Sequence, residues 1–198
     1  MEAFNHSLFL LINAPAHPGA AVLMLARLSA KYLILLMPLT LLLGWLRGGE
    51  RIRKLMLEAA ICALLALLVA QIIGVVWPHP RPFMIGLGHQ FLPHVADSSF
   101  PSDHLTLMWS VSFSLLLHAE SRAAGALLAI LGLPIAWARI YLGVHFPLDM
   151  AGAALVAALS AWLCLRQARW IVEPMFPWMT TVYRRLFAAL IRRGWVLE

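Results

Sequence analysis

Histidine, arginine and aspartate occur in this sequence at spacings that suit phosphate chemistry. Arg139, His145 and Asp149 share the run Arg-Ile-Tyr-Leu-Gly-Val-His-Phe-Pro-Leu-Asp. Pro147 favours the first turn of a helix, so we expect His145 and Asp149 on one helix face. A carboxylate that holds one imidazole nitrogen fixes the tautomer and leaves the other nitrogen free to attack. The run therefore predicts a nucleophilic histidine, with Arg139 nearby as a bidentate phosphate ligand.

A second run, residues 100–104, reads Phe-Pro-Ser-Asp-His and precedes an apolar stretch. It is typical of a helix start, where free backbone N–H groups and the helix dipole favour an anion. Ser102 would add a hydroxyl donor, and His104 would lie one turn into the site. Arg81, followed by Pro82, ends the preceding apolar stretch and offers a second arginine. Together these residues predict a site that binds phosphate and supplies a nucleophile and an acid.

These charged residues are set in apolar sequence. All three aspartates of the chain fall within residues 97–149. Ionisable groups at membrane depth are costly, so they are usually functional and have partners in a pocket. The alternative is that each one merely extends to the membrane interface. Because the set comes from three separate segments, we favour a shared pocket.

The elements that must position these residues are membrane helices. The 198 residues are 62% apolar and 12% charged, whereas a soluble domain is about half apolar and a quarter charged. This composition excludes a soluble enzyme, a disordered chain and a secreted disulfide scaffold. Five stretches approach the roughly 20 apolar residues that a span needs: 30–46, 55–77, 105–118, 123–142 and 146–165. We expect an all-α integral membrane protein with a bundle of five to six transmembrane helices.

We interpret residues 1–198 as a single membrane domain. Residues 1–29 are broken by the run Pro-Ala-His-Pro-Gly at 15–19. They could form a bent sixth span or a pair of interfacial helices. Residues 170–198 mix aromatic residues with arginines, which is typical of an amphipathic helix on the cytoplasmic leaflet.

The basic residues set the expected orientation. The net charge is +6, from 15 Lys+Arg and 9 Asp+Glu. The basic residues gather in short runs beside apolar stretches, which favours the lipid bilayer over nucleic acid as the partner. Most of them lie in the connections 47–54 and 118–122 and after residue 165. The positive-inside rule therefore places the long connection 78–104, with the candidate site, outside the cytoplasm.

Three motifs resemble the signature of the phosphatidic acid phosphatase type 2 superfamily of membrane lipid phosphatases. That signature reads Lys-x6-Arg-Pro, Pro-Ser-Gly-His and Ser-Arg-x5-His-x3-Asp. The corresponding segments here are Gly74-x6-Arg81-Pro82, Pro101-Ser102-Asp103-His104 and Ala138-Arg139-x5-His145-x3-Asp149. Within the superfamily the chain is most similar to the bacitracin-resistance type of undecaprenyl-diphosphatase, in Pro-Ser-Asp-His, His-x-Arg-Pro-Phe and Tyr-Leu-Gly-Val-His.

The resemblance implies a phosphatase that works through a phosphohistidine, without a metal or other cofactor. His145 would attack phosphorus, oriented by Asp149, and His104 would protonate the leaving group and then activate water. The phosphate oxygens would be held by Arg81, Ser102 and Arg139. The implied substrate is undecaprenyl diphosphate, hydrolysed to the monophosphate at the outer face of a bacterial inner (plasma) membrane. This reaction would recycle the lipid carrier of cell-wall synthesis.

The sequence departs from the signature at three positions. Gly74 replaces a lysine, Ala138 replaces a serine, and Asp103 replaces a glycine. We interpret Asp103 as a cap of the helix start, although it could pair with His104 or an arginine. Lys31, which begins an apolar stretch on the same side of the membrane, is our candidate for the missing cation. The alternative for Lys31 is an interfacial lysine without a role in the site.

Two other functions remain compatible with the motifs. The enzyme could act on another lipid phosphate, such as phosphatidylglycerol phosphate, phosphatidic acid or lipid A, because the motifs contact the phosphate and not the tail. Alternatively, the charged cluster could bind an anion without cleaving it, in a transporter subunit. The paired His145 and Asp149 argue against transport, since binding alone needs no nucleophile. The oligomeric state is left open.

Overall fold

The computed structural model describes residues 2–197. Its helices are α1 (Glu2–Ile12), α2 (Ala20–Tyr32), η1 (Leu33–Leu35), α3 (Leu36–Arg47), α4 (Glu50–Val76), η2 (Pro82–Ile85), α5 (Asp103–Leu116), α6 (Arg122–Tyr141), α7 (Pro147–Leu186) and α8 (Ala188–Arg192). Within these residues there is no strand, which confirms the all-helical prediction.

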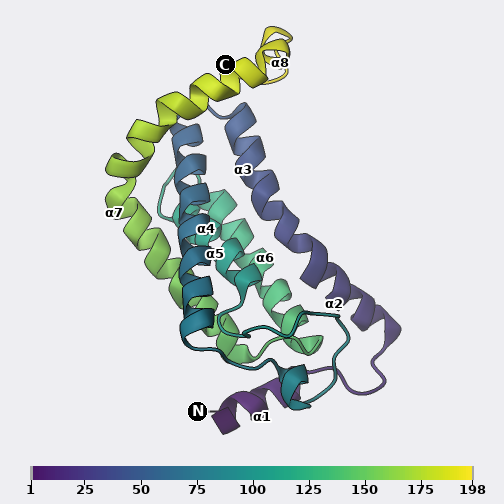
Figure 1. Cartoon of the computed structure of the whole chain (residues 1–198). Coiled ribbons are helices and arrows are strands. Elements are labelled where there is room, and N and C mark those ends of the chain that lie inside the picture. Colours follow the sequence, from purple (N-terminus) through teal and green to yellow (C-terminus); the bar gives the residue numbers. More distant parts are fainter. Residues whose placement is uncertain (1, 198) are drawn as a thin grey trace.

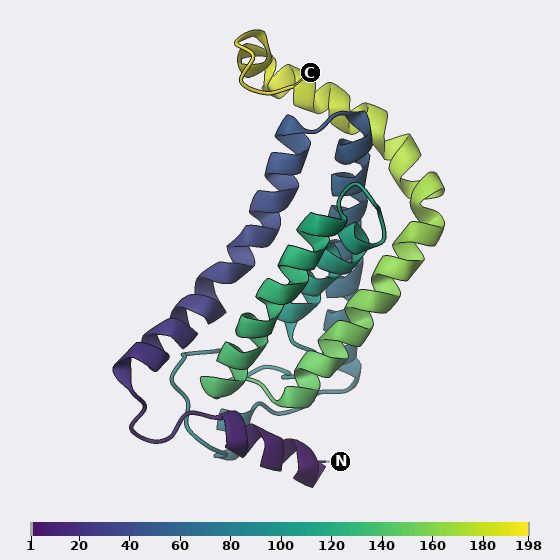
Figure 2. The same ribbon diagram turned by 180° about the vertical axis from the view of Figure 1, so that it is seen from behind.

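Helix α5 is the centre of the bundle. It packs against α4, α6 and α7, which surround it in both ribbon views (Figures 1 and 2). With 14 residues, α5 is about 21 Å long, shorter than the hydrocarbon layer. Its neighbours cover it, and most of its side chains are buried. The predicted stretch 105–118 is therefore an internal helix that need not span lipid alone.

The first span is longer than the sequence indicated. Residues Ala20–Arg47 form one continuous candidate span, whereas the apolar stretch was expected to begin at residue 30. Pro38 lacks the N–H group that would bond to the carbonyl of Ile34, and the helix tightens to a 3₁₀ turn at η1 just before it. Residues 20–29 therefore belong to the span.

Helix α1 lies across the end of the bundle that is opposite the C-terminus (Figure 1). Asn5 Oδ1 accepts a hydrogen bond from the backbone N–H of Leu148 (3.1 Å). Phe9 packs edge-on against Phe146, with ring centroids 5.3 Å apart. These contacts attach α1 to the start of α7. The position of α1 relative to the membrane interface remains a prediction.

Helix α7 continues from the bundle into the C-terminal segment. The helix contains Pro174 and Pro177, and in this region it bends across the end of the bundle (Figure 1). The expected last span and the expected tail helix are therefore parts of one bent helix. Arg53 of α4 and Tyr183 of α7 both donate hydrogen bonds to the Leu197 carbonyl (2.7 Å each), which fastens the tail to α4.

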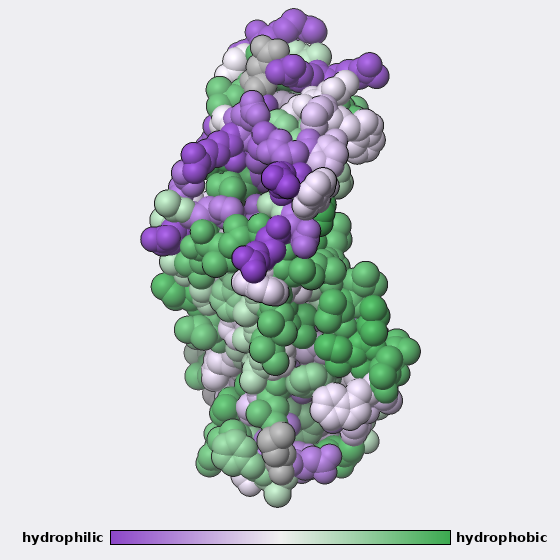
Figure 3. Space-filling view, turned by 90° about the vertical axis from the view of Figure 1, so that its left-hand side faces the viewer, coloured by the Kyte–Doolittle hydropathy of each residue, from purple (hydrophilic) through white to green (hydrophobic). Residues whose placement is uncertain are grey.

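The surface has the polarity of a membrane protein. Hydrophilic residues gather at the end that carries the C-terminus, and below them the surface is largely hydrophobic (Figure 3). Large apolar side chains such as Leu64, Leu133 and Leu155 are about 60% exposed or more. Four segments are long and apolar enough to cross a membrane: Ala20–Arg47, α4, α6 and α7. The chain is a multi-pass membrane protein.

Candidate active site

One cavity of about 360 Å³ brings the three motif segments together. Its polar lining comes from the connection between α4 and α5, the start of α5, and the end of α6 with the turn that follows. The lining residues are Ile34, Leu67, Gln71, Arg81, His94, Asp103, His104, Leu107, Arg139 and His145. The volume is in the range of sites for small molecules. The cavity lies at the end of the bundle opposite the arginine-rich tail.

A tight turn after α6 places His145 over this cavity. Gly143 has φ +79°, a left-handed conformation that glycine adopts without strain. A Cβ at this position would also lie against the backbone of His89. The N–H of Val144 then bonds to the Arg139 carbonyl (3.1 Å). The turn therefore directs Arg139 and His145 toward each other.

The partners of His145 define its tautomer. Nδ1 is 3.1 Å from Asp149 Oδ2. An ionised carboxylate accepts hydrogen bonds and cannot donate them. Nε2 is 3.0 Å from Arg81 Nη1 and 3.4 Å from Arg139 Nη2, and guanidinium groups only donate. The proton is therefore assigned to Nδ1, and the lone pair of Nε2 points at the two arginines. The imidazole, 1% exposed, is oriented for attack through Nε2.

The Asp149 carboxylate is held by more groups than the sequence indicated. Its Oδ2 accepts the backbone N–H of Phe146 (2.8 Å) and the hydroxyl of Ser99 (2.5 Å) in addition to His145. Ser99 is fully buried, and its own N–H bonds to the His79 carbonyl (2.7 Å). Sequence reasoning missed Ser99, because only its proximity to the Pro-Ser-Asp-His run could have indicated it.

Arg81 is fixed by the connection in which it lies. It is 3% exposed and donates from Nε to Asp97 Oδ1 (2.8 Å) and from Nη2 to the Ser98 carbonyl (3.1 Å). Its Nη1 donates to the Val144 carbonyl (2.9 Å). These bonds leave Nη1 facing His145 Nε2, where a phosphate attacked by that nitrogen would lie.

Arg139 has an unused donor. The side chain is 2% exposed, and its Nη2 is 3.1 Å from His94 Nε2. Its Nε has no hydrogen-bond partner among residues 2–197. A buried donor without a partner destabilises a fold by about 1–3 kcal/mol, and a phosphate oxygen would satisfy it. Arg139 therefore supports the predicted role as a phosphate ligand.

The start of α5 supplies Ser102 and His104. Ser102 is the N-cap residue and is fully buried, and its hydroxyl has no partner. Its backbone N–H bonds to the Asp149 carbonyl (3.3 Å), so α5 begins directly beside the His145–Asp149 pair. His104 lines the cavity with both arginines. Ser102 does not line this cavity, and its phosphate contact remains a prediction.

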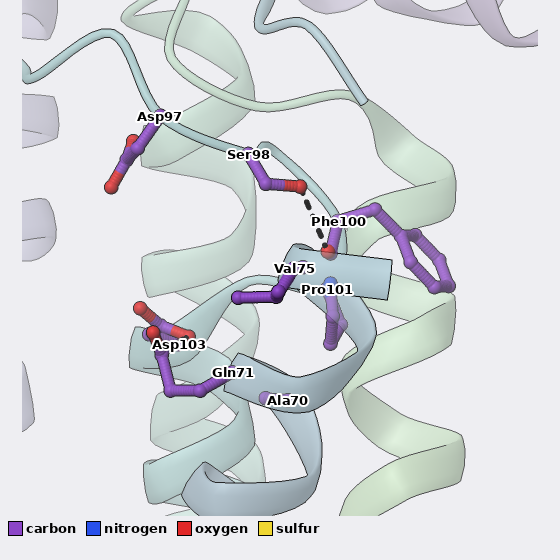
Figure 4. Close-up of a pocket in the computed structure, with 9 residues that line it drawn as sticks. Ala70, Gln71, Val75, Asp97, Ser98, Phe100, Pro101 and Asp103 are labelled. Atoms are coloured by element: carbon purple, nitrogen blue, oxygen red, sulfur yellow. Dashed lines mark hydrogen bonds between the residues drawn. The ribbon is translucent and has the colours of Figure 1, made fainter. Parts of the chain in front are cut away.

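Two departures from the family signature lie side by side. Gly74 and Asp103 both line a second cavity of about 150 Å³. Figure 4 shows Asp103 with the other labelled residues that line this cavity. Asp103 is the first residue of α5, but its Oδ1 accepts a hydrogen bond from Gln71 Nε2 (2.9 Å) instead of capping the helix. A Cβ on Gly74 would face Ser98 at 3.4 Å. The position that lacks the lysine of the family signature and the position that carries an additional carboxylate therefore line the same cavity.

Lys31 does not line the cavity that contains Arg81 and Arg139. It lines a separate cavity with Arg27 and Tyr32 and with residues 91–93 of the connection between α4 and α5. Its Nζ lies over the Tyr32 ring, 5.4 Å from the centroid. The structure therefore does not bring Lys31 to the place left by Gly74, and its role in substrate binding stays a prediction without structural support.

His94 belongs to the cavity, although the sequence did not assign it to the site. It lines the cavity and contacts Arg139, whereas His89, in the same connection, is exposed. Burial, with a further contribution from Arg81 and Arg139, lowers the pKa of His94. Burial and then the charges of Arg139 and Arg81 lower the pKa of His145 well below its ordinary value. Both imidazoles are therefore neutral near pH 7.

Comparisons with known proteins agree with this arrangement. A family model described as the PAP2 superfamily matches residues 55–173. YbjG of Escherichia coli (strain K12), provisionally named an undecaprenyl-diphosphatase, is 40% identical over 201 residues, which cover 100% of both chains. Undecaprenyl-diphosphatase BcrC of Bacillus subtilis (strain 168) is 31% identical over 96% of both.

Two solved structures share the fold. LpxE of Aquifex aeolicus has a TM-score of 0.64 and 27% identity, over 82% of this chain and 95% of that chain. A PAP2-type phosphatidylglycerolphosphate phosphatase of Bacillus subtilis has a TM-score of 0.56 over 86% and 87%, and at 18% identity it supports the fold alone. With the family match over residues 55–173 and the full-length relatives, this chain belongs to the PAP2 superfamily of phosphatases.

Proposed function

We propose that this protein hydrolyses undecaprenyl diphosphate to undecaprenyl phosphate and inorganic phosphate. His145 Nε2 attacks the terminal phosphorus, and the bond from that phosphorus to the bridging oxygen breaks. The lipid monophosphate leaves with a proton from His104, which is then a base, and the phosphoryl group stays on His145. Water, deprotonated by His104, then attacks the phosphohistidine and releases phosphate. Arg81 and Arg139 bind the equatorial oxygens, on which negative charge is spread in the transition state.

The observation that carries the proposal is the tautomer of His145. Its lone pair faces the two buried guanidinium groups, and its proton faces Asp149. A transporter that only bound anions would need the cations, but it would not need an imidazole that a carboxylate orients for attack. Phosphoryl transfer therefore explains more of the site than binding does.

The lipid nature of the substrate is supported by the apolar residues of the cavity. Ile34, Leu67 and Leu107 line it together with the charged groups. They come from η1, α4 and α5, so an apolar chain could leave the cavity between these helices while the phosphates stay with the arginines. The name of the relative BcrC supports the undecaprenyl chain.

The substrate is tested with purified protein and a panel of lipid phosphates. We expect phosphate release from undecaprenyl diphosphate to exceed that from phosphatidylglycerol phosphate, phosphatidic acid and a lipid A phosphate. The rate should persist in a chelator, since the proposed chemistry uses no metal. Within residues 2–197 no group of three His, Cys, Asp or Glu side chains is placed to hold a metal ion. Faster hydrolysis of another lipid would reassign the substrate, and loss of activity in the chelator would contradict the mechanism.

We further propose that the site faces the outside of a bacterial inner membrane. The connection between α4 and α5, which brings Arg81 and His94 to the cavity, lies at the end of the bundle opposite the arginine-rich C-terminal end (Figure 1), and basic residues favour the cytoplasmic side. A cysteine introduced at exposed Ala96 should react with a membrane-impermeant maleimide in spheroplasts. A cysteine at Arg185, in the tail, should react only after lysis. The reverse labelling pattern would mean that the site faces the cytoplasm.

The pH dependence of the reaction should reflect the lowered pKa of His145. An imidazole with a lowered pKa stays neutral to lower pH, so activity is lost only when the pH falls through that lowered value. We expect the acidic limb of kcat/KM below pH 6.5, the ordinary histidine value being about 6.5. Initial rates between pH 4 and 9, corrected for titration of the substrate, give this limb. A limb at or above pH 6.5 would contradict a buried, neutral nucleophile.

Ser99→Ala should lower kcat about 10- to 100-fold with little change in KM. The hydroxyl donates to Asp149 Oδ2 and so helps to hold the group that orients His145, but it does not line the cavity. Steady-state rates on undecaprenyl diphosphate measure the effect. Ser98→Ala, one residue away, is the control, because the Ser98 side chain bonds to backbone groups of His79 and Phe100 instead. Equal losses in both variants would indicate a general loosening of the connection.

A further inference from the structure

His94 lines the same cavity as His145. It enters the cavity from the connection between α4 and α5, and its side chain is 21% exposed. Its ring centroid is 6.2 Å from that of His145. His94 is therefore beside the position at which His145 would attack a terminal phosphate.

The hydrogen bonds of His94 show which atom faces the cavity. Nδ1 is 3.1 Å from the carbonyl oxygen of Val95, which can only accept, so Nδ1 carries the proton. Nε2 is 3.1 Å from Arg139 Nη2, which can only donate. In this structure His94 thus acts as the acceptor for a cation whose proposed partner is a phosphate oxygen. An incoming phosphate and His94 compete for the same N–H group.

The two arginines are proposed to hold the terminal phosphate, so a second phosphate would take other donors. Apart from Arg81, Arg139 and His145, the side chains lining the cavity that can present an N–H group are Gln71, His94 and His104. One of the two N–H groups of the Gln71 amide is bonded to Asp103, and His104 has the acid–base role in the proposed mechanism. No lysine reaches this cavity from position 74, which is glycine. His94 is therefore the candidate donor to the second phosphate.

We propose that His94 is a substrate-binding residue that selects a diphosphate over a monophosphate, an inference that rests on the proposed function. When the terminal phosphate takes the N–H groups of Arg139, His94 is released from that bond. The negative charge of the substrate favours protonation of its imidazole. The imidazolium then donates from Nε2 to the phosphate that leaves with the lipid. Asp97, 3.8 Å from Nδ1, and the guanidinium of Arg81 are the other charged groups beside the ring.

The test compares the binding of two non-lipid probes to the purified protein by calorimetry, namely methylenediphosphonate and inorganic phosphate. His94→Ala should weaken the binding of methylenediphosphonate about 10- to 100-fold, the range for one hydrogen bond to a charged group. Binding of inorganic phosphate should stay within about threefold or become tighter, because Arg139 loses its resident acceptor. His94→Gln, whose amide can still donate, should recover part of the loss.

His89→Ala is the matched control. His89 lies in the same connection, but it is exposed and does not line the cavity, so both probes should bind as to the unaltered protein. Equal weakening of both probes by His94→Ala, or no weakening of either, would overturn the proposal. Since the measurement needs no turnover, it separates the two proposals. Selectivity for the diphosphonate without hydrolysis of undecaprenyl diphosphate would refute the proposed function and leave the role of His94 standing.

Discussion

Replacing His145 with alanine should reduce phosphate release from undecaprenyl diphosphate by about 10⁴-fold or more, the scale seen when a covalent nucleophile is removed. The reason is geometric. Nε2 is the atom on which Arg81 and Arg139 converge, and Asp149 holds the opposite nitrogen. Without it the cavity can still bind the phosphate, but it has lost the group that forms the covalent intermediate. Initial rates of the purified variant, measured against His89→Ala, give the loss.

The covalent intermediate offers an independent check on the same residue. A His104→Ala variant lacks the group that activates water, so it should accumulate an acid-labile phosphohistidine from radiolabelled substrate. The double variant with His145→Ala should carry no label. If His145→Ala alone retained more than about 1% of the rate, or if the double variant were labelled, another group would be the nucleophile. Either result would refute the assignment.

The sequence predicted the spans well, because each is a long and strongly apolar stretch. It placed the start of the first span ten residues late, since Arg27 lowers the apolar character of residues 20–29 and Lys31 follows closely. In the structure both side chains line a cavity with residues 91–93. Hydropathy alone cannot distinguish such an end from a separate interfacial segment.

Within the site, motif spacing predicted which residues lie together where a helix or a tight turn carries them. Asp149 lies on the first turn of α7, His145 lies just before that helix and not on it as expected, and a glycine turn orients Arg139. Ser99 and His94 escaped notice because they lie on an irregular connection, where no period relates position in the sequence to direction in space. Their roles follow from contacts with Asp149 and Arg139, which only the fold establishes.

The departures at Gly74 and Asp103 have a common physical reading. In the family signature these positions are a lysine and a glycine, and here the two residues line one cavity together with Asp97. A lysine at position 74 would lie near Asp97 and Asp103. Here the amide of Gln71 donates a hydrogen bond to the Asp103 carboxylate instead. The proposed binding of the terminal phosphate therefore depends on Arg81 and Arg139. We expect lysine to substitute for either arginine less well here than in a site with three cations.

Asp149→Asn should lower kcat by about 10³- to 10⁴-fold while leaving KM nearly unchanged, the scale found when an amide replaces the carboxylate that orients a catalytic histidine. Oδ2 of Asp149 accepts from Phe146 N–H, Ser99 and His145 Nδ1. An asparagine can present its oxygen to these donors in only one rotamer. In the other rotamer its NH₂ faces Nδ1, moves the imidazole proton to Nε2 and removes the attacking lone pair.

Glu173→Gln is the matched control for this change. It makes the same carboxylate-to-amide replacement on the same helix. Glu173, however, pairs with Lys54 at the surface and does not line the cavity. Its activity should stay within about twofold of the unaltered protein. A proportional rise in KM in Asp149→Asn would mean that the carboxylate supports binding of the substrate instead of the tautomer. Unchanged kcat would mean that the Arg81 and Arg139 donors alone suffice to orient His145, and the proposed division of roles would be wrong.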